Sequence, residues 1–495
     1  SPIPNPQSPI PNPQSPNVFK NQIFIKLINK HILLFSIKMI FNNFFKLLLS
    51  QCFLFTLAQN KVIFVFEHFR HGARSPSTLN ESDFDSLNEK WNGLQELSNV
   101  GLRQHYLLGN YIRNKYKDLI NYEKYNPKEI EVLSTITNRT IMSARAQLHG
   151  IFKNSKPKKI EGDQVNTCLP YYLLEEKEKY NINNISLYPD NFPEEVPVHI
   201  VDIKEKLMQL EKTDECPVIK KIRAENKKKK EIVDFCQKFN KTFGEKLLKL
   251  LNKTNDKNFF SEYENVNDVC IETIIDVFDD RKLGILNNEI DIDSLFNMSM
   301  EFFRLKTTIV YANNNNGTLA YVGSSILMRK ILSYMEKIID DINNKVNDSP
   351  KLVLLSSHDT AICNMEGLLS NLFNIKVEAP TFAASYIFEL VKEDPENKYT
   401  VNLIFNDVLI KSINFDDFKN KIKTSSWTYE QTAKYCGFKE EKKEIIKEES
   451  NTSDSLWLNI IIIFSLLDSL VVIIIAFLLI KRHNKKSSLD SSQNL

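Results

Sequence analysis

Two kinds of hydrophobic pattern follow one another along residues 59–440. Short apolar runs rich in Val, Ile, Leu and Phe predict β-strands at 61–66, 131–134, 351–356, 385–391 and 399–405. Apolar residues at steps of three and four predict helices at 98–119, from Thr137 onward and at about 324–344. Strands that alternate with helices indicate an α/β fold, with a mixed, mostly parallel central sheet flanked by helices. In such a fold the functional site lies at the carboxyl ends of the strands.

The stretch from about 165 to 303 breaks this alternation. It is charged, rich in Asn and Lys, helical in its periodicity and without a convincing strand pattern. We interpret it as a smaller helical subdomain inserted between two parts of the α/β core.

The first 58 residues differ in composition from a folded enzyme. Residues 1–7 are repeated at 8–14 in a proline-rich tract that cannot form a core, so residues 1–38 are interpreted as a low-complexity extension and a gene-model artefact. Residues 39–58 begin at Met39 with a short basic start, continue with an apolar run and end in small residues, which is typical of a secretory signal peptide. The alternative is that 23–57 is a genuine membrane anchor.

The other end predicts a membrane span. Residues 456–480 contain nineteen Leu, Ile, Val or Phe and no Lys or Arg, which is enough to cross a bilayer as a single transmembrane helix. The basic run that follows places the tail, 481–495, in the cytoplasm. Residues 441–455 are then a juxtamembrane linker, and 59–440 an ectodomain of a single-pass type I protein. Asp468 within the span is read as a tolerated acid, with a contact to a partner helix as the alternative.

Composition limits the remaining functions and the chemistry of the cysteines. A net charge of +2, with 25% charged residues, argues against a dedicated nucleic-acid binder. Once Cys52 leaves with the signal peptide, the wide spacing of the other cysteines and the lack of a Cys-x-x-Cys pair favour disulfides over metal ligation, with fifteen pairings open. These cysteines are Cys168, Cys216, Cys236, Cys270, Cys363 and Cys436. Glycosylation acceptor patterns occur at Asn80, Asn184, Asn240, Asn252, Asn297, Asn316 and Asn347.

Three segments at strand ends carry groups suited to a phosphate. The first is Arg70-His71-Gly72-Ala73-Arg74-Ser75-Pro76, in which an imidazole stands between two arginines on a tight loop. Arg139 lies at the start of the helix after the second strand, where the helix N-terminus also attracts anions. His358 and Asp359 directly follow the most apolar strand. The alternative, a surface turn forming ion pairs with neighbours such as Glu67, does not explain the ordered later segments.

These segments resemble the histidine acid phosphatases, whose hallmarks are Arg-His-Gly-x-Arg-x-Pro near the start and a late His-Asp pair. The Arg139-Thr-x-x-Ser-Ala segment and the Pro-Val-His block ending at His199 are similar to intervening blocks of that family. The resemblance covers residues 60–440 and is strongest to the lysosomal and prostatic type of membrane-anchored acid phosphatase. It implies a phosphoglycerate-mutase-like fold and hydrolysis of phosphate monoesters.

The resemblance also implies the roles of the site residues. His71 is expected to be the nucleophile, forming a phosphohistidine. Asp359 is expected to be the proton donor, in surroundings that keep it partly protonated at acid pH. The phosphate is expected to be bound by Arg70, Arg74, Arg139 and His358, with no metal and no cofactor. Placed on the family's disulfide pattern, Cys236 has no counterpart and the preferred bridge joins Cys216 to Cys436.

Several readings remain open on the sequence. A phytase or inositol-polyphosphate phosphatase shares the late His-Asp pair, although Ser77 stands where many phytases carry Thr. A catalytically inactive receptor-like relative would be expected to lack one of the catalytic residues, and a cytosolic phosphoglycerate-mutase-like enzyme disagrees with an exported chain. The cellular location is a lysosome, another acidic vesicle or the cell surface, and homodimer formation is open.

Four further histidines are expected to lie near the site or to serve packing. His68 either lines the site or packs beneath it, and His199 is a candidate for the rim of the substrate pocket. His105 and His149 fall within predicted helices and are expected to serve packing alone.

Overall fold

A computed structural model gives the fold. It describes residues 46, 60–76, 93–155, 195–201, 216–250, 256–278, 290–312, 317–393 and 398–437. The chain divides into two units, Ser1–Thr432 and Ala433–Leu495, and all of the elements discussed below lie in the first. The predicted signal peptide, linker, membrane span and tail fall outside the described residues. Among the described residues no helix combines the length and apolarity that a membrane crossing requires.

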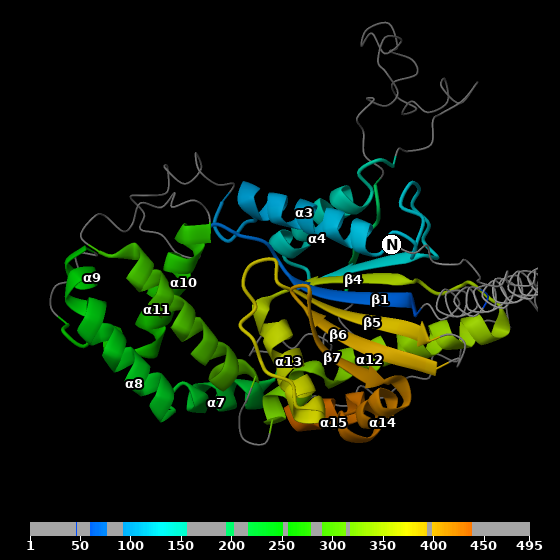
Figure 1. Cartoon of the computed structure of the whole chain (residues 1–495). Helices are drawn as coiled ribbons and strands as arrows, with labels where there is room; N and C mark the ends of the chain where they lie inside the picture. The colour runs from blue at the N-terminus through cyan, green and yellow to red at the C-terminus, as the bar shows by residue number, and fades with distance from the viewer. Residues whose placement is uncertain are drawn as a thin grey trace, which may run out of the picture. The chain divides into compact units, whose positions relative to one another are not determined.

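One seven-stranded sheet forms the centre of the first unit, in the order β3-β2-β4-β1-β5-β6-β7 (Figure 1). The strands are β1 (Lys61–Arg70), β2 (Ile130–Ser134), β3 (His199–Ile200), β4 (Leu352–Ser357), β5 (Ser385–Glu393), β6 (Lys398–Phe405) and β7 (Val408–Asn414). Strands β1 to β4 pair in parallel, whereas β5, β6 and β7 form an antiparallel meander beside β1. The predicted α/β class and mixed sheet are confirmed.

The register of the parallel strands brings the predicted site segments to one edge of the sheet. Arg70 at the end of β1 lies opposite Ser357 at the end of β4, and Ser134 at the end of β2 lies opposite Ser356. Because parallel strands point the same way, the loops that follow β1, β2 and β4 emerge together.

Helices cover both faces of the sheet (Figure 1). On one face, α3 (Asn99–Lys115) and α4 (Asn138–Ile151) bury Ile112 and Ile151 against Val65 and Leu354. On the other face lie α12 (Thr318–Asn344), α13 (Asp359–Phe373) and α14 (Phe415–Ser425), whose apolar side chains join those of β1, β4, β5 and β6 in the larger core cluster. Burial of these apolar side chains is the main favourable term in stabilising the layers.

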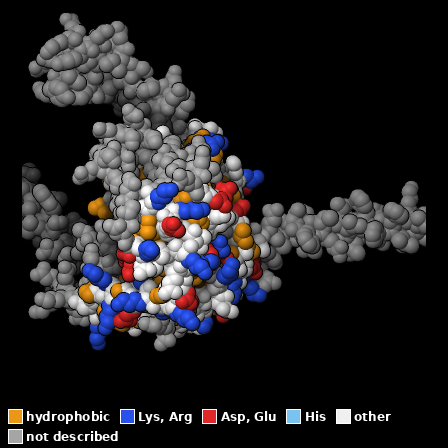
Figure 2. All heavy atoms as spheres, turned by 90° about the vertical axis from the view of Figure 1, so that its left-hand side faces the viewer, with side chains coloured by type: hydrophobic (Ala, Val, Ile, Leu, Met, Phe, Trp, Pro, Cys, Tyr) orange, Lys and Arg blue, Asp and Glu red, His pale blue; other side chains and the backbone are white. Residues whose placement is uncertain are grey.

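The helical subdomain forms the left-hand part of Figure 1. Its elements are α7 (Pro217–Asn226), α8 (Lys230–Phe239), η4 (Asn240–Gly244), α9 (Glu245–Leu250), η5 (Phe259–Ser261), α10 (Tyr263–Phe278), α11 (Ile292–Leu305) and η6 (Lys306–Ala312). It has its own aromatic core, in which Phe235 packs against Phe302 and Phe239 against Phe260. Figure 2 shows basic and acidic side chains interspersed on the described part of this face.

Element boundaries differ from the predicted ones where polar residues are buried or apolar ones exposed. Strand β1 runs four residues beyond its predicted end because Glu67 and His68, both fully buried, interrupt the apolar run without ending the strand. Strand β7 was not predicted; it lies at the edge of the sheet, where its Val408 and Leu409 are exposed. Helix α12 begins earlier than predicted, after Gly317 in a left-handed conformation.

The expectation that the exported cysteines form disulfides is wrong for three of them in this structure. Cys216 and Cys436 are disulfide-bonded, as the preferred bridge requires, although their mutual pairing stays a prediction. Cys236, Cys270 and Cys363 are free thiols, each buried among apolar residues of a helix. A buried free cysteine behaves as a small apolar side chain, so sequence spacing alone did not distinguish the two states. Cys168 lies outside the described residues.

Candidate active site

The loop after β1 is held between β4 and the segment leading into β5. The amide of His71 donates to the carbonyl of Ser357 at 2.9 Å, and the carbonyl of His71 accepts from the amide of Ala383 at 3.1 Å. The amide of Arg70 donates to the carbonyl of Ala384 at 2.9 Å. These bonds on both sides fix the backbone of the two residues that are predicted to touch the phosphate.

The next residues of the loop pack directly on the two helices above the sheet. A Cβ added at Gly72 would lie 2.6 Å from the carbonyl oxygen of Gly101 at the start of α3, so a side chain there would force the loop away. The amide of Gly72 donates to Oγ of Ser143 at 3.1 Å, and the amide of Ala73 donates to Oε1 of Gln104 at 2.9 Å. Close approach to α3 and α4 therefore explains why glycine occupies position 72.

His71 has the protonation state and tautomer of a nucleophile. Its side chain is buried, and Nδ1 lies 2.9 Å from the carbonyl oxygen of Gly72, which can only accept a hydrogen bond. The proton is therefore on Nδ1, and Nε2 carries the lone pair. Burial, followed by the charges of Arg70, His358 and Arg139, lowers the pKa of His71 well below its usual value. The imidazole is neutral at acid pH and available to attack an electrophile.

Arg70 is clamped on several sides. Its guanidinium donates to the carbonyl of Pro380 at 2.9 Å and pairs with the carboxylate of Asp359 at 3.1 Å. The ring of Phe382 lies 4.3 Å from its Cζ, and the ring of Phe303 lies 5.5 Å away. Among the described residues, its buried Nε has no hydrogen-bond partner. An anion at this position would satisfy that donor.

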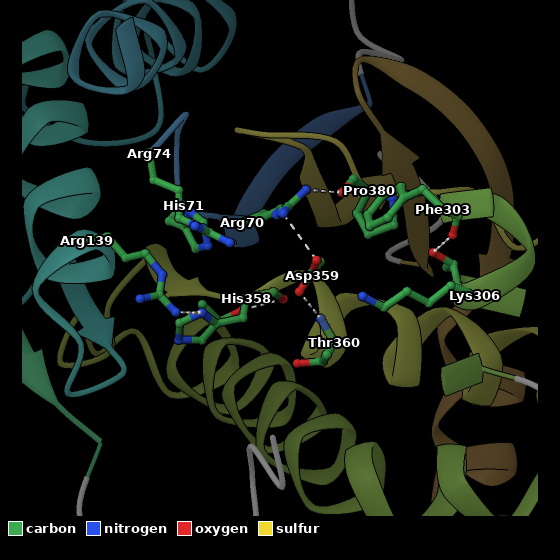
Figure 3. A network of polar contacts seen from close by, with 12 residues as sticks. Arg70, His71, Arg74, Arg139, Phe303, Lys306, His358, Asp359, Thr360 and Pro380 are labelled. Carbon is green, nitrogen blue, oxygen red and sulfur yellow. Dashed lines mark hydrogen bonds and ion pairs between the residues drawn. The ribbon is translucent and has the colours of Figure 1, made fainter. Parts of the chain in front are cut away.

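The side chains of Arg139 and His358 contact each other on one side of the site (Figure 3). A guanidinium nitrogen of Arg139 donates to Nδ1 of His358 at 3.2 Å, so the proton of His358 is on Nε2. That Nε2 lies 3.1 Å from Oγ1 of Thr135 and 3.2 Å from Oγ1 of Thr137. Burial and the charge of Arg139 lower the pKa of His358 to about 3, which keeps the imidazole neutral.

The charge state of Asp359 differs from the predicted one. Burial alone would raise its pKa, but the positive charges of Arg70 and Lys306 outweigh burial and lower the pKa to about 2. The amide of Thr360, at the start of α13, also donates to its Oδ1 at 2.9 Å. Asp359 is therefore a carboxylate in this structure, and the expectation of a partly protonated acid is wrong for the protein without a bound phosphate. The sequence does not reveal how closely the cations approach it.

Arg74 completes the cluster of positive charge. It is half-buried, donates to the carbonyl of Ser75 at 2.8 Å, and burial together with the charge of Arg139 lowers its pKa to about 10. Because Arg139 and Arg70 are close enough to lower the pKa of Arg74, the cluster favours a bound anion. No group of three His, Cys, Asp or Glu side chains able to hold a metal ion occurs among the described residues.

All six predicted site residues meet at this edge of the sheet (Figure 3). They are Arg70, His71, Arg74, Arg139, His358 and Asp359. Sequence reasoning missed Thr135, Thr137, Phe382 and Lys306. The two threonines lie within the second predicted segment and could have been found there, whereas Phe382 and Lys306 carry no motif signal.

The other histidines take separate places. His68 packs beneath the site, with Nε2 2.5 Å from Oγ of Ser357 and Nδ1 3.4 Å from the sulfur of Met365. His105 is buried against Gln147, as expected for packing, and His149 is exposed on α4. His199 is exposed on the short edge strand β3, and its predicted place at the pocket rim stays a prediction.

Glu67 excludes the surface-turn reading of the first motif. Its two carboxylate oxygens accept from Ser385 and Gln147, each at 2.6 Å, beneath the loop. Among the described residues Glu67 therefore forms no ion pair with Arg70 or Arg74.

Comparison with known proteins agrees with this geometry. The sequence pattern of the histidine phosphatase superfamily (branch 2) matches residues 61–406. The lysosomal acid phosphatase of Xenopus laevis is 27% identical over 359 residues, which cover 71% of this chain and 71% of that protein. The prostatic acid phosphatase of Bos taurus is 25% identical over 345 residues, which cover 70% of this chain and 77% of that protein.

Solved structures of phytases are also similar to this chain. The phytase from Citrobacter braakii has a TM-score of 0.46 at 14% identity and covers 73% of this chain and 97% of its own. The phytase from D. castellii has a TM-score of 0.46 at 15% identity and covers 77% of this chain and 82% of its own.

Proposed function

The chain belongs to branch 2 of the histidine phosphatase superfamily, and we propose on this basis that it hydrolyses phosphate monoesters through a phosphohistidine formed on His71. Its family and its acid phosphatase relatives support the activity of a phosphoric monoester hydrolase. The observation that carries the role of His71 is its geometry: a neutral, buried imidazole whose Nε2 lone pair is free of the Gly72 hydrogen bond and lies among guanidinium groups.

In the first step, Nε2 of His71 attacks the phosphorus atom and the ester P–O bond breaks. The guanidinium groups of Arg70, Arg74 and Arg139 hold the non-bridging oxygens and offset the charge that builds up on them. His358 adds a hydrogen-bond donor once its ring rotates, so that its Nε2–H group points to the phosphate and no longer to the threonine hydroxyls. Asp359 gives a proton to the departing oxygen, so that an alcohol and not an alkoxide leaves.

The substrate is proposed to supply the proton that Asp359 needs. The pKa of Asp359 is about 2 in the empty site, so the carboxylate is ionised at working pH. A phosphate monoester loses its second proton near pH 6, so below that value it arrives as a monoanion carrying one proton. When the phosphoryl group neutralises Arg70, the attraction that keeps Asp359 ionised weakens and the proton can move to the carboxylate. Activity is therefore expected to fall as pH rises above about 6.

In the second step, water hydrolyses the phosphohistidine. Asp359, now a carboxylate, takes a proton from the water molecule while the water oxygen attacks phosphorus. The P–N bond breaks, His71 returns to its neutral form and inorganic phosphate leaves. Asp359 passes the proton that it took from water to the departing phosphate, which leaves as the monoanion, so each residue ends in its starting state. The scheme uses no metal or cofactor.

We propose that the reaction takes place on the non-cytoplasmic side of a membrane. The signal-peptide pattern at 39–58 and the apolar stretch at 456–480 support an exported, anchored chain. Lysosomal and prostatic relatives support a lysosome or a secretory destination. An acidic compartment would also keep the substrate in the monoanionic form that the mechanism uses.

The test is an assay of the full chain with p-nitrophenyl phosphate, an alkyl phosphate and phytate across pH. His71→Ala should abolish turnover of all three substrates. Asp359→Asn should cost about 10²- to 10⁴-fold with the alkyl phosphate and less with p-nitrophenyl phosphate, whose better leaving group needs less protonation. Undiminished hydrolysis by His71→Ala would refute the mechanism, and a strong preference for phytate would favour the inositol-polyphosphate reading.

A further inference from the structure

Lys306 is a buried cation beside the active site to which the mechanism gives no part. It is the first residue of η6, directly after α11 of the helical subdomain, and only 8% of it is exposed. Its Nζ donates to Oδ1 of Asn267 at 2.8 Å and lies 5.6 Å from the ring centroid of Tyr311. Among the described residues it forms no ion pair with a carboxylate. A buried ammonium with only neutral partners favours a nearby anion.

The position of Lys306 relative to Asp359 identifies the side of the site that it serves. In Figure 3 the ammonium points toward Asp359 from the side opposite Arg139 and His358. Its charge is also close enough to lower the pKa of Asp359, second only to that of Arg70. Because Asp359 is the proposed donor to the leaving oxygen, the alcohol portion of the substrate lies on this side. Lys306 therefore faces the leaving group, while the three arginines face the transferred phosphoryl group.

The reaction itself creates the need for an anion here. In the empty site, the carboxylate of Asp359 partly compensates the charges of Arg70 and Lys306. When Asp359 takes up a proton to act as an acid, that compensation is lost. For Arg70, which pairs with Asp359, the negative charge of the phosphoryl group replaces that of the carboxylate. Nothing in the phosphoryl group restores the compensation for Lys306, which lies on the far side of Asp359.

We propose that Lys306 forms a second anion subsite, which favours phosphate monoesters whose alcohol carries a further phosphate or carboxylate near the ester oxygen. This proposal rests on the active site proposed above and adds a substrate class to it. Charge-assisted hydrogen bonds of this kind are stronger than neutral ones, so a matched substrate with the second anion should be preferred at least about tenfold in kcat/KM.

The experiment compares monophosphates and bisphosphates of ethylene glycol, propanediol and butanediol, with phosphoglycolate as the carboxylate counterpart. The wild-type chain should prefer the bisphosphate of at least one diol, at the chain length that reaches Lys306. Phosphoglycolate distinguishes a general anion subsite from one that takes phosphate alone. A wild-type chain that shows no preference at any length would overturn the proposal without any variant.

Variants then connect the preference to Lys306. Lys306→Met should lower the bisphosphate-to-monophosphate ratio of kcat/KM about tenfold, whereas Lys306→Arg should keep that ratio. Lys330→Met is the matched control, because Lys330 also lies over an aromatic ring, that of Tyr334 at 5.4 Å, but on α12. Equal losses on both substrates in Lys306→Met would show a structural role and overturn the proposal.

His71→Ala separates failure of this subsite from failure of the proposed function. It should abolish turnover of both members of each pair. If His71→Ala abolishes turnover while the wild type shows no preference for bisphosphates, the proposed active site is supported and the anion subsite is refuted. If His71→Ala remains active, the proposed mechanism falls, and with it the assignment of a leaving-group side to Lys306.

Discussion

Phe382 offers a sharp test of how the aromatic surroundings position the phosphate site. Its ring lies 4.3 Å from Cζ of Arg70 and 5.8 Å from the ring of His71, and only 6% of the residue is exposed. The change Phe382→Leu keeps an apolar side chain at the position and removes the aromatic face. Arg70 and His71 would then lose the surface that orients them, without losing any hydrogen bond.

The expected loss follows from these contacts. A desolvated cation–π contact contributes about 2 kcal/mol. An aromatic pair adds about 0.5–1.5 kcal/mol. For the pair of His71 and Phe382 we take the lower end of this range, because the imidazole ring is small. If all of this contact energy served to position the two residues for the phosphoryl group, the total of about 2–3 kcal/mol would set an upper limit of about 30- to 150-fold on the loss of affinity. The cost to stability should be smaller, about 1.5 kcal/mol or less, because Leu fills most of the space.

Competitive inhibition by inorganic phosphate measures this affinity directly, with kcat/KM for an alkyl phosphate as a second readout. Phe388→Leu is the matched control, since Phe388 is fully buried in the sheet and packs on Tyr386 at 5.5 Å, away from the site. The control should lower the urea midpoint and leave phosphate inhibition unchanged. If Phe382→Leu behaves in the same way, its ring serves packing alone and the reasoning is wrong.

Two further predictions concern the support of the loop. Burial raises the pKa of Glu67 to about 7 despite hydrogen bonds from Ser385 and Gln147, so its contribution to stability is fully present below about pH 4.5 and lost as pH rises through about 7. Urea midpoints across that range should fall in the wild type and flatten in Glu67→Gln; equal slopes would contradict this. Gly72→Ala should lower stability by about 1–3 kcal/mol and kcat by at least about tenfold, because the new Cβ meets the Gly101 backbone at 2.6 Å. A fully active, stable Gly72→Ala would show that the loop can yield.

The sequence predicted the location of the site better than its electrostatics. The segments of His71, Arg139 and His358 each follow a strand, and parallel strands end at one edge, so their meeting could be expected from order alone. The charge of Asp359 could not, because it depends on the 3.1 Å contact with Arg70 and on the approach of Lys306 from the inserted subdomain. Such contacts join residues far apart in the chain and leave no local pattern.

The fold shows the same division. Strands with continuous apolar runs, such as β4, were predicted to within a residue, because burial on both faces leaves a clear pattern. The predicted end of strand β1 was too early, because the apolar run stops at Glu67, whose carboxyl group is buried and hydrogen-bonded within the strand. Strand β7 was missed although it is partly apolar, because its apolar residues do not alternate with polar ones and the first two are exposed at the sheet edge. Hydrophobic pattern therefore predicts elements well in the core and poorly where polar groups are buried or strands reach the edge.

The site concentrates positive charge that the single carboxylate of Asp359 compensates only in part. The charges of Arg70 and Lys306 lower the pKa of Asp359, and Arg74 is near enough to be affected by the Asp359 charge, while burial reduces the screening of these charges by water. Such an arrangement favours a bound phosphate, and in the proposed mechanism it keeps the carboxylate of Asp359 ionised until the phosphate arrives. The proposed mechanism therefore couples protonation of Asp359 to binding of the phosphoryl group, and it attributes the expected acid dependence to the substrate's own proton. An enzyme built this way needs no raised pKa in its free state, and a free-enzyme titration of Asp359 near pH 5 would contradict the coupling.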